Sequence, residues 1–128
     1  MKNLNNCIER KKYNEYPIWF MRQAGRYLPE FRKIRKYNPN FINLCLNEKL
    51  CIELSLQPLK RYDLDAAIIF SDILMIPYGL GQNLEFKKDF GPKLDTLVLD
   101  KIINTETNVF IKKMQPIYES IKKIKKKT

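Results

Sequence analysis

The chain has 128 residues, of which 45% are hydrophobic and 30% are charged, and its formal charge is +10. This length suits one small domain, and no apolar run approaches the roughly 20 residues of a membrane-spanning helix. The sequence has no histidine, which excludes histidine-activated nucleophiles and histidine-containing zinc sites. The three cysteines lack C-x-x-C spacing, so we expect free thiols in a cytoplasmic protein with no membrane association.

The positive charge comes mainly from lysine, which supplies 18 of the 24 basic residues. A basic surface attracts polyanions, whether nucleic acid or a polycarboxylate. The lysine-rich end, residues 122–127, has no interleaved aromatic residues, so we interpret it as the solvated end of a helix. We therefore expect no nucleic-acid partner.

The first half of the chain predicts an arm followed by two helices. Residues 1–16 show no clear period and no apolar signal region, and we expect a flexible N-terminal arm. Residues 29–36 predict a short helix that begins at a proline. Asn47 is the predicted N-cap of a helix over residues 48–61, which Pro58 should kink or shorten.

Residues 64–70 end in a continuous apolar run rather than an alternating one. Such a run is typical of a strand buried on both faces, as in a parallel sheet. Ser71 and Asp72 then bring polar groups to the carboxyl end of the predicted strand. Because the chain offers this strand no parallel partner, we expect an α/β fold that is the N-terminal piece of a larger one.

The last third of the chain predicts a short extended piece and a long helix. Residues 84–86 follow a glycine-containing loop and are predicted to be extended. Apolar residues at positions 110, 114, 117, 121 and 124 recur at spacings of four and three, which indicates a helix. Asn104 or Thr105 could cap this helix, and Pro116 interrupts its pattern once.

Four of the six arginines lie close together, between positions 22 and 35. Arginine binds a carboxylate or phosphate through a two-pronged fork, whereas lysine acts as a point charge. Arg22 and Arg26 flank the small residues Ala24 and Gly25, which would let a ligand approach the backbone closely. Alternatively, these arginines pair with surface acids such as Glu30, and the spacing leaves both interpretations open.

Asp72 is the second candidate functional residue. It follows the predicted strand at its carboxyl end, where α/β barrels place their active-site groups. Its carboxylate could accept several N–H donors from one ligand. The alternative is an N-cap for a helix that starts at Ile73, and the sequence alone favours neither interpretation.

One block of the sequence is distinctive as a whole. Residues 17–32 read Pro-Ile-Trp-Phe-Met-Arg-Gln-Ala-Gly-Arg-Tyr-Leu-Pro-Glu-Phe-Arg. This block closely resembles the N-terminal signature of the uroporphyrinogen decarboxylase family. Residues 56–59, 64–74 and 90–92 resemble further blocks of that family in the same order. We therefore expect residues 17–128 to be the N-terminal part of a uroporphyrinogen decarboxylase barrel domain.

The resemblance implies the N-terminal portion of a (β/α)₈ TIM barrel, truncated after the first βα unit or units. It implies decarboxylation of the four acetate side chains of uroporphyrinogen III to give coproporphyrinogen III in porphyrin and haem biosynthesis. The family uses no metal and no organic cofactor, and a full-length member is expected to be a homodimer. The family's further tyrosine, serine and histidine have no counterparts in this chain, so we expect the isolated chain to be inactive.

The resemblance also assigns roles to single residues. It implies that Asp72 accepts the pyrrole N–H groups and stabilises a protonated pyrrole while the carboxylate leaves. It implies that Arg22 is the candidate proton donor. The substrate-binding positions that it implies are Arg22, Gln23, Ala24, Gly25, Arg26, Arg35 and Asp72.

Two other functions are compatible with the residues. The first is a non-catalytic binding module whose arginine cluster holds an acidic ligand without turnover. The second is a basic nucleic-acid-associated protein, which would show a salt-dependent DNA affinity spread over the lysines. The enzyme interpretation differs from both because it concentrates function at residues 22–35 and at Asp72.

Overall fold

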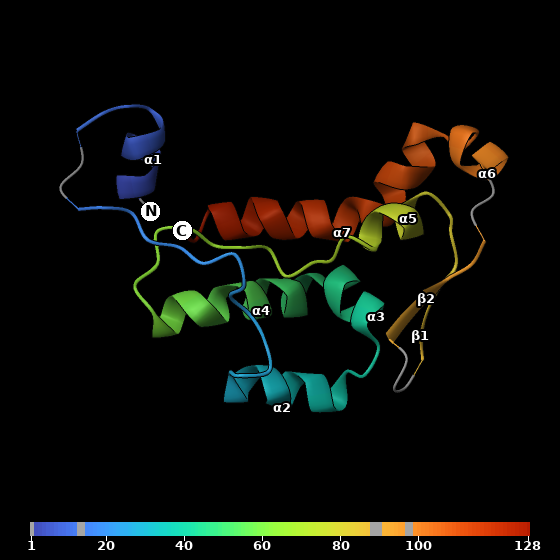
Figure 1. Ribbon diagram of the computed structural model, residues 1–128, viewed down its shortest axis with the longest axis horizontal. Helices are drawn as coiled ribbons and strands as arrows, with labels where there is room; N and C mark the ends of the chain where they lie inside the picture. Colours follow the sequence, from blue (N-terminus) through green and yellow to red (C-terminus); the bar gives the residue numbers. More distant parts are fainter. Residues whose placement is uncertain (1, 13–14, 88–90, 97–98) are drawn as a thin grey trace.

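The computed structural model describes residues 2–12, 15–87, 91–96 and 99–128 (Figure 1). These residues form seven helices and one two-stranded sheet. The elements in chain order are α1 (Lys2–Ile8), α2 (Pro29–Tyr37), α3 (Phe41–Leu46), α4 (Glu48–Arg61), α5 (Met75–Gly79), β1 (Leu84–Lys87), β2 (Gly91–Leu94), α6 (Leu99–Ile103) and α7 (Thr107–Lys125).

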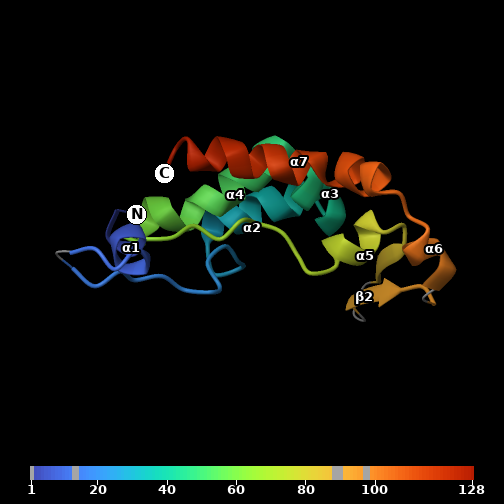
Figure 2. The ribbon, with the colours of Figure 1, turned by 90° about the horizontal axis from the view of Figure 1, so that it is seen from above.

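Helices α4 and α7 form the centre of the molecule. They pack side by side and run in the same direction, while residues 64–72 return along them in a largely extended conformation (Figure 1). In the view from above, the hairpin of β1 and β2 lies at one end with α5 and α6, and both chain termini lie at the other end (Figure 2). None of the helices in the described parts of the chain is both long and apolar enough to cross a bilayer.

The hydrophobic core joins the helix pair to the elements around it. Helix α3 contacts both α4 and α7, α2 packs on α4, and α5 packs on α7. Burial of these apolar side chains is the main stabilising contribution to such a fold. The buried members of the core are Leu28, Phe31, Ile42, Leu44, Cys45, Leu54, Phe70, Met75, Met114 and Ile117.

The structure confirms the main predicted helices. Helix α2 begins at Pro29, and the Asn47 side chain caps α4 by accepting a hydrogen bond from the Leu50 N–H at 3.1 Å. Pro58 does not shorten α4, which continues to Arg61. The expected extended piece is β1, whose Leu84 lies opposite Leu94 of β2 in the antiparallel hairpin.

The long final helix is also present, but its cap differs from the prediction. Its N-cap is Glu106, which makes no side-chain capping bond, rather than Asn104 or Thr105. Helix α7 also continues through Pro116, whose carbonyl accepts a hydrogen bond from the Ser120 hydroxyl at 2.8 Å. A strong apolar stripe therefore outweighs a single proline and an imperfect cap.

The prediction of a buried parallel strand at residues 64–70 is wrong for this structure. These residues are extended but join no ladder, because none of the strands in the described chain lies beside them. Only Phe70 is buried among residues 64–70, and Ile68 is 37% exposed. In a sheet, a neighbouring strand bonds to the backbone N–H and C=O groups of a strand, and other elements cover its faces. Here side chains provide part of that hydrogen bonding.

Apart from α5, for which the sequence offered only the alternative of a helix starting at Ile73, three short helices were not predicted from the sequence. Helix α1 lies inside the arm expected at residues 1–16, so that arm contains regular structure. Helix α3 is capped by Asn40, whose side chain accepts a hydrogen bond from the Asn43 N–H at 3.0 Å. The third is α6. Helices of five to seven residues are too short to show a clear period, so only tertiary contacts reveal them.

Candidate functional site

Residues 17–28, which we call the arginine loop, lie against residues 64–72, which we call the Asp72 segment. One connection between them is reciprocal. The Asp65 N–H donates to the Ile18 carbonyl at 2.8 Å, and the Ile18 N–H donates to Asp65 Oδ2 at 3.0 Å. This pair fixes the start of the loop against the start of the segment.

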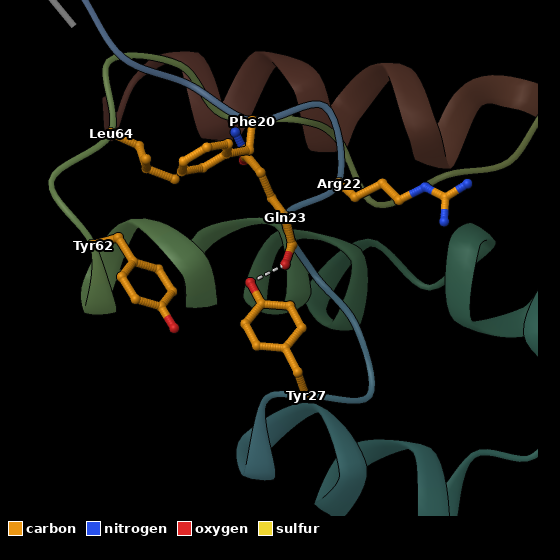
Figure 3. Close-up of a pocket in the computed structure, with 6 residues that line it drawn as sticks. All are labelled: Phe20, Arg22, Gln23, Tyr27, Tyr62 and Leu64. Carbon is orange, nitrogen blue, oxygen red and sulfur yellow. Dashed lines mark hydrogen bonds between the residues drawn. The ribbon is translucent and has the colours of Figure 1, made fainter.

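Gln23 makes the second connection. Its side chain is 3% exposed, whereas the neighbouring Arg22 is exposed. Gln23 Nε2 donates to the Ala66 carbonyl at 2.8 Å, and its Oε1 accepts from the Ile68 N–H at 2.9 Å. The Tyr27 hydroxyl donates to the Gln23 carbonyl and steadies the loop from its other side (Figure 3). Both the nitrogen and the oxygen of the Gln23 amide are therefore hydrogen-bonded within the protein.

Arg22 and Arg26 are exposed, and their side chains form no hydrogen bond or ion pair with any residue that the structure describes. The main-chain N–H groups of residues 22–26 likewise donate to none of the described residues. An added Cβ at Gly25 would meet the Tyr27 ring at an ordinary 3.5 Å, so the fold itself does not require glycine there. The loop thus presents two exposed cationic side chains beside main-chain N–H groups that have no partner among the described residues.

The other arginines near the loop serve the fold. Arg32 donates to the carbonyls of Arg26 and Tyr27 at 2.7 and 3.2 Å. Arg61 of α4 grips both carboxylate oxygens of Glu30, at 2.8 and 3.0 Å. This hydrogen bond lowers the pKa of Glu30 and raises that of Arg61.

The alternative that the clustered arginines pair with Glu30 is therefore wrong for Arg22 and Arg26. Glu30 is paired with Arg61, which lies 31 residues further along the chain. The two loop arginines are left available for a ligand.

Arg35 extends the cationic region toward α3. Its guanidinium donates to the Asn38 carbonyl at 2.7 Å and lies over the Phe41 ring, 5.8 Å from the centroid. Arg35 and Asp72 both act on the Cys45 thiol. Burial raises the pKa of Cys45 to about 12, Cys51 and Asp72 add to that rise, and Arg35 opposes it. The two charged groups therefore lie within electrostatic reach of the same thiol.

One carboxylate oxygen of Asp72 is hydrogen-bonded to the main chain two residues further on. Its Oδ1 accepts from the Leu74 N–H at 2.9 Å, and its carbonyl accepts from the Met75 N–H at 3.1 Å. Helix α5 begins at Met75 with Leu74 as its N-cap, so Asp72 does not cap a helix that starts at Ile73. The half-buried carboxylate keeps Oδ2, which bonds to no described residue.

A pocket of about 260 Å³ opens where the loop meets the Asp72 segment. Three phenylalanines form its wall, with Phe31 and Phe41 edge-on to Phe70 at centroid distances of 5.7 and 5.6 Å. Ligand pockets usually measure about 300–1,000 Å³, so this one suits part of a large ligand. It is lined by Gln23, Ala24, Phe31, Phe41, Ile68, Ile69, Phe70 and Ser71.

A second pocket of about 210 Å³ lies on the other side of Gln23. Figure 3 shows the Tyr27 and Tyr62 rings on one side of it, while the Arg22 guanidinium points away from both rings. The pocket is lined by Phe20, Arg22, Gln23, Tyr27, Tyr62 and Leu64. Sequence reasoning did not identify Tyr62 or Phe41 as lining residues, because neither lies in the arginine block.

The structure thus brings all seven predicted site residues to one region. Gln23, Ala24 and the residue before Asp72 line one pocket, and Arg35 stacks on another lining residue, Phe41. Arg22 and Arg26 lie on the adjoining loop, with Gly25 between them. No group of three or more carboxylate or thiol side chains that could hold a metal ion occurs among the described residues.

Comparison with known proteins identifies the family of this chain. The family model for uroporphyrinogen decarboxylase matches residues 1–128. The uroporphyrinogen decarboxylase of Rickettsia felis is 45% identical over 128 residues, which cover 98% of this chain and 36% of that protein. The enzyme of a Chelativorans species is 45% identical over 109 residues, which cover 85% of this chain and 32% of the relative. The enzyme of Brucella anthropi is 47% identical over 106 residues, which cover 83% of this chain and 31% of that protein.

The chain spans about one third of the length of these relatives. The similarity to the Rickettsia felis enzyme covers 98% of this chain, and it includes both the arginine loop and the Asp72 segment. The chain therefore belongs to the uroporphyrinogen decarboxylase family.

Proposed function

We propose that residues 17–128 form the N-terminal part of a (β/α)₈ barrel that decarboxylates uroporphyrinogen III to coproporphyrinogen III. In that barrel the Asp72 segment is the first strand, and its carboxyl end faces the active site. The mixed helix and strand content and the family match support this assignment. The proposal includes a homodimer in the cytoplasm, and the three free cysteines fit a reducing compartment.

The observation that carries the proposal is the contrast among the arginines. Arg22 and Arg26 are unpaired within the described chain, whereas Arg32, Arg35 and Arg61 bond to carbonyls or a carboxylate. Two free guanidinium forks beside unpaired N–H groups suit a ligand with several carboxylates. Uroporphyrinogen III has eight, and the absence of a side chain at Gly25 leaves room for one to reach the backbone.

We assign the electrostatic role to Asp72. One of its oxygens is fixed by the Leu74 N–H at 2.9 Å, which holds the other in a defined direction. A fixed carboxylate stabilises the positive charge that forms when a pyrrole of the substrate takes up a proton. The bond from the acetate carbon to its carboxylate then breaks, its electron pair moves toward the ring, and carbon dioxide leaves. A proton delivered to the acetate carbon completes the methyl group, and loss of the proton that the ring first took up restores the neutral pyrrole.

The test is a turnover assay on two proteins. In the first, a chimera, residues 1–128 replace the matching segment of the Rickettsia felis relative. The second is the 128-residue chain by itself. We expect the chimera to produce coproporphyrinogen III from uroporphyrinogen III under anaerobic conditions, and the isolated chain to produce none above background. A folded chimera with no turnover would contradict the proposed function.

One observation favours a second candidate, a binding module without turnover. Arg22 and Arg26 are exposed, so the described residues do not enclose a reaction site from water. Water screens charge interactions, which weakens the field around Asp72 but still permits binding of a polyanion. Calorimetry with uroporphyrin distinguishes the candidates, because a binding module retains affinity in the isolated chain while the chimera gains no turnover.

A further inference from the structure

Gln23 is buried within a loop whose neighbouring side chains face solvent. Phe20 and Met21 are 62% and 77% exposed, and Gln23 is 3% exposed. Its amide bonds to Ala66 and Ile68, which are two residues apart on one edge of the extended Asp72 segment. A buried amide with both ends satisfied in this way holds two pieces of backbone together.

The bonding pattern is that of a neighbouring parallel strand. In a parallel ladder, one residue donates to the carbonyl before its partner and accepts from the N–H after it. The Gln23 amide makes these two bonds around Ala67, at 2.8 and 2.9 Å. It therefore occupies part of an edge that would otherwise be unsatisfied.

The next bonds along the same edge come from α4. The Phe70 N–H donates to Ser55 Oγ at 2.8 Å, and the Phe70 carbonyl accepts from Cys51 Sγ at 3.4 Å. The Asp72 segment is thus fixed to the scaffold at Phe70 and to the arginine loop at Ile68. Asp72 follows Ile68 by four residues, which limits the separation of their Cα atoms to about 14 Å.

We propose that Gln23 is a positioning residue, which holds the arginine loop and the Asp72 segment in one register so that Arg22 and Asp72 act on the same ligand. This role rests on the proposed function. It also refines the expectation that Gln23 binds substrate, because its amide already has both of its partners in the protein. A shift of about 1 Å between catalytic groups can cost 10²-fold in rate.

The chemistry of residue 23 gives the role a distinctive signature. An amide both donates and accepts, whereas an ionised carboxylate only accepts. In Gln23→Glu the ionised carboxylate would face the Ala66 carbonyl with no hydrogen between them. A protonated Glu restores one donor and one acceptor, so lowering the pH should restore the register. A leucine side chain at position 23 can neither donate nor accept a hydrogen bond at any pH.

The experiment measures kcat per folded molecule in the chimera between pH 5.5 and 8, with the folded fraction taken from circular dichroism. At pH 8 we expect Gln23→Glu to lose about 10–100-fold relative to wild type and to recover as the pH falls. Gln23→Leu should stay low throughout. Gln115→Leu, which removes a surface amide bonded to Glu119, is the matched control and should match wild type.

A second measurement needs no turnover. In the 128-residue chain, Gln23→Leu should lower the hydrogen-exchange protection of the Ile68 N–H by about 2–10-fold, the effect of one lost hydrogen bond. The Phe70 N–H, which bonds to Ser55, should keep its protection. Unchanged protection at Ile68 overturns the structural basis of the role.

The outcomes separate the two proposals. An active wild-type chimera whose Gln23 variants keep their kcat per folded molecule overturns the positioning role alone. A folded wild-type chimera with no turnover overturns the proposed function and the positioning role that rests on it. A loss in Gln23→Glu that does not recover at low pH also overturns the role.

Discussion

The arginine loop and the α4–α7 helix pair are stabilised in different ways. In the helix pair, apolar side chains are removed from water, with Leu54 at 0% and Met114 at 3% exposure. In the loop, residues such as Phe20 and Met21 remain exposed, and side-chain hydrogen bonds to the Asp72 segment hold its shape. The helix pair provides stability, and the loop offers unpaired charge and N–H groups to a ligand.

The comparison predicts that the largest loss of stability comes from the helix pair. Leu54→Ala should lower the free energy of unfolding by about 2–5 kcal/mol, because it removes buried methyl groups and leaves a cavity. Urea unfolding followed by circular dichroism measures this. The control is Ile121→Ala on α7, where the side chain is 41% exposed. It should change stability by about 0.5 kcal/mol or less. Equal effects would mean that this helix pair is not the core.

The largest loss of function should come from Asp72. In the chimera, Asp72→Asn should reduce kcat by about 10²–10³-fold, because the charge that stabilises a protonated pyrrole is gone. Asparagine keeps an oxygen that can accept from the Leu74 N–H, so the thermal midpoint should change little. Asp63→Asn, at an exposed carboxylate, is the control. If Asp72→Asn lowers the midpoint and spares kcat, Asp72 is a structural residue.

A smaller loss of kcat/KM should distinguish the arginines without a partner among the described residues from the paired ones. Arg22→Lys in the chimera should lower kcat/KM by about 10–100-fold, since a point charge replaces a two-pronged bond to a carboxylate. Arg61→Lys disturbs the pair with Glu30 instead, and should leave kcat/KM unchanged. Steady-state kinetics of both variants test the contrast. Equal losses would indicate that overall positive charge, rather than the loop, attracts the substrate.

The smallest effect should be a decline in the free energy of unfolding at high pH, caused by the buried thiol of Cys45. Burial raises the pKa of Cys45 to about 12, above its value in the unfolded chain. Between these two pKa values the unfolded chain has lost a proton that the folded chain keeps, so stability falls as pH rises. Urea midpoints from pH 8 to 11 should fall less steeply in Cys45→Ala than in wild type. Identical slopes would exclude Cys45 as the cause.

Local sequence patterns predicted much of the helical structure. The proline at position 29, the Asn47 cap and the apolar stripe of α7 all correspond to elements in the structure. These signals act within a few turns of one helix, so they need no information about distant residues. The same locality explains why the expected shortening at Pro58 does not occur, because tertiary packing keeps helix α4 intact to Arg61.

The arginine block and Asp72 were identified from residue type and resemblance, but which of these side chains has a partner within the protein depends on the tertiary structure. Glu30 binds Arg61, which is 31 residues away, and this distant pairing leaves Arg22 and Arg26 free. Gln23 is engaged by residues 43 and 45 positions further on. Spacing along the chain carries no information about such partners, because hydrogen bonds form between groups that only folding brings together.

Sequence patterns alone were sufficient to locate helices α2, α4 and α7, the apolar run at residues 64–70 and the polar residues that follow it. Tertiary structure decided that this run is extended without a strand partner, because a ladder depends on a second strand and not on local preference. It also decided which polar groups are satisfied internally and which face outward. Local propensity is a property of neighbouring residues, whereas partner choice is a property of the folded chain.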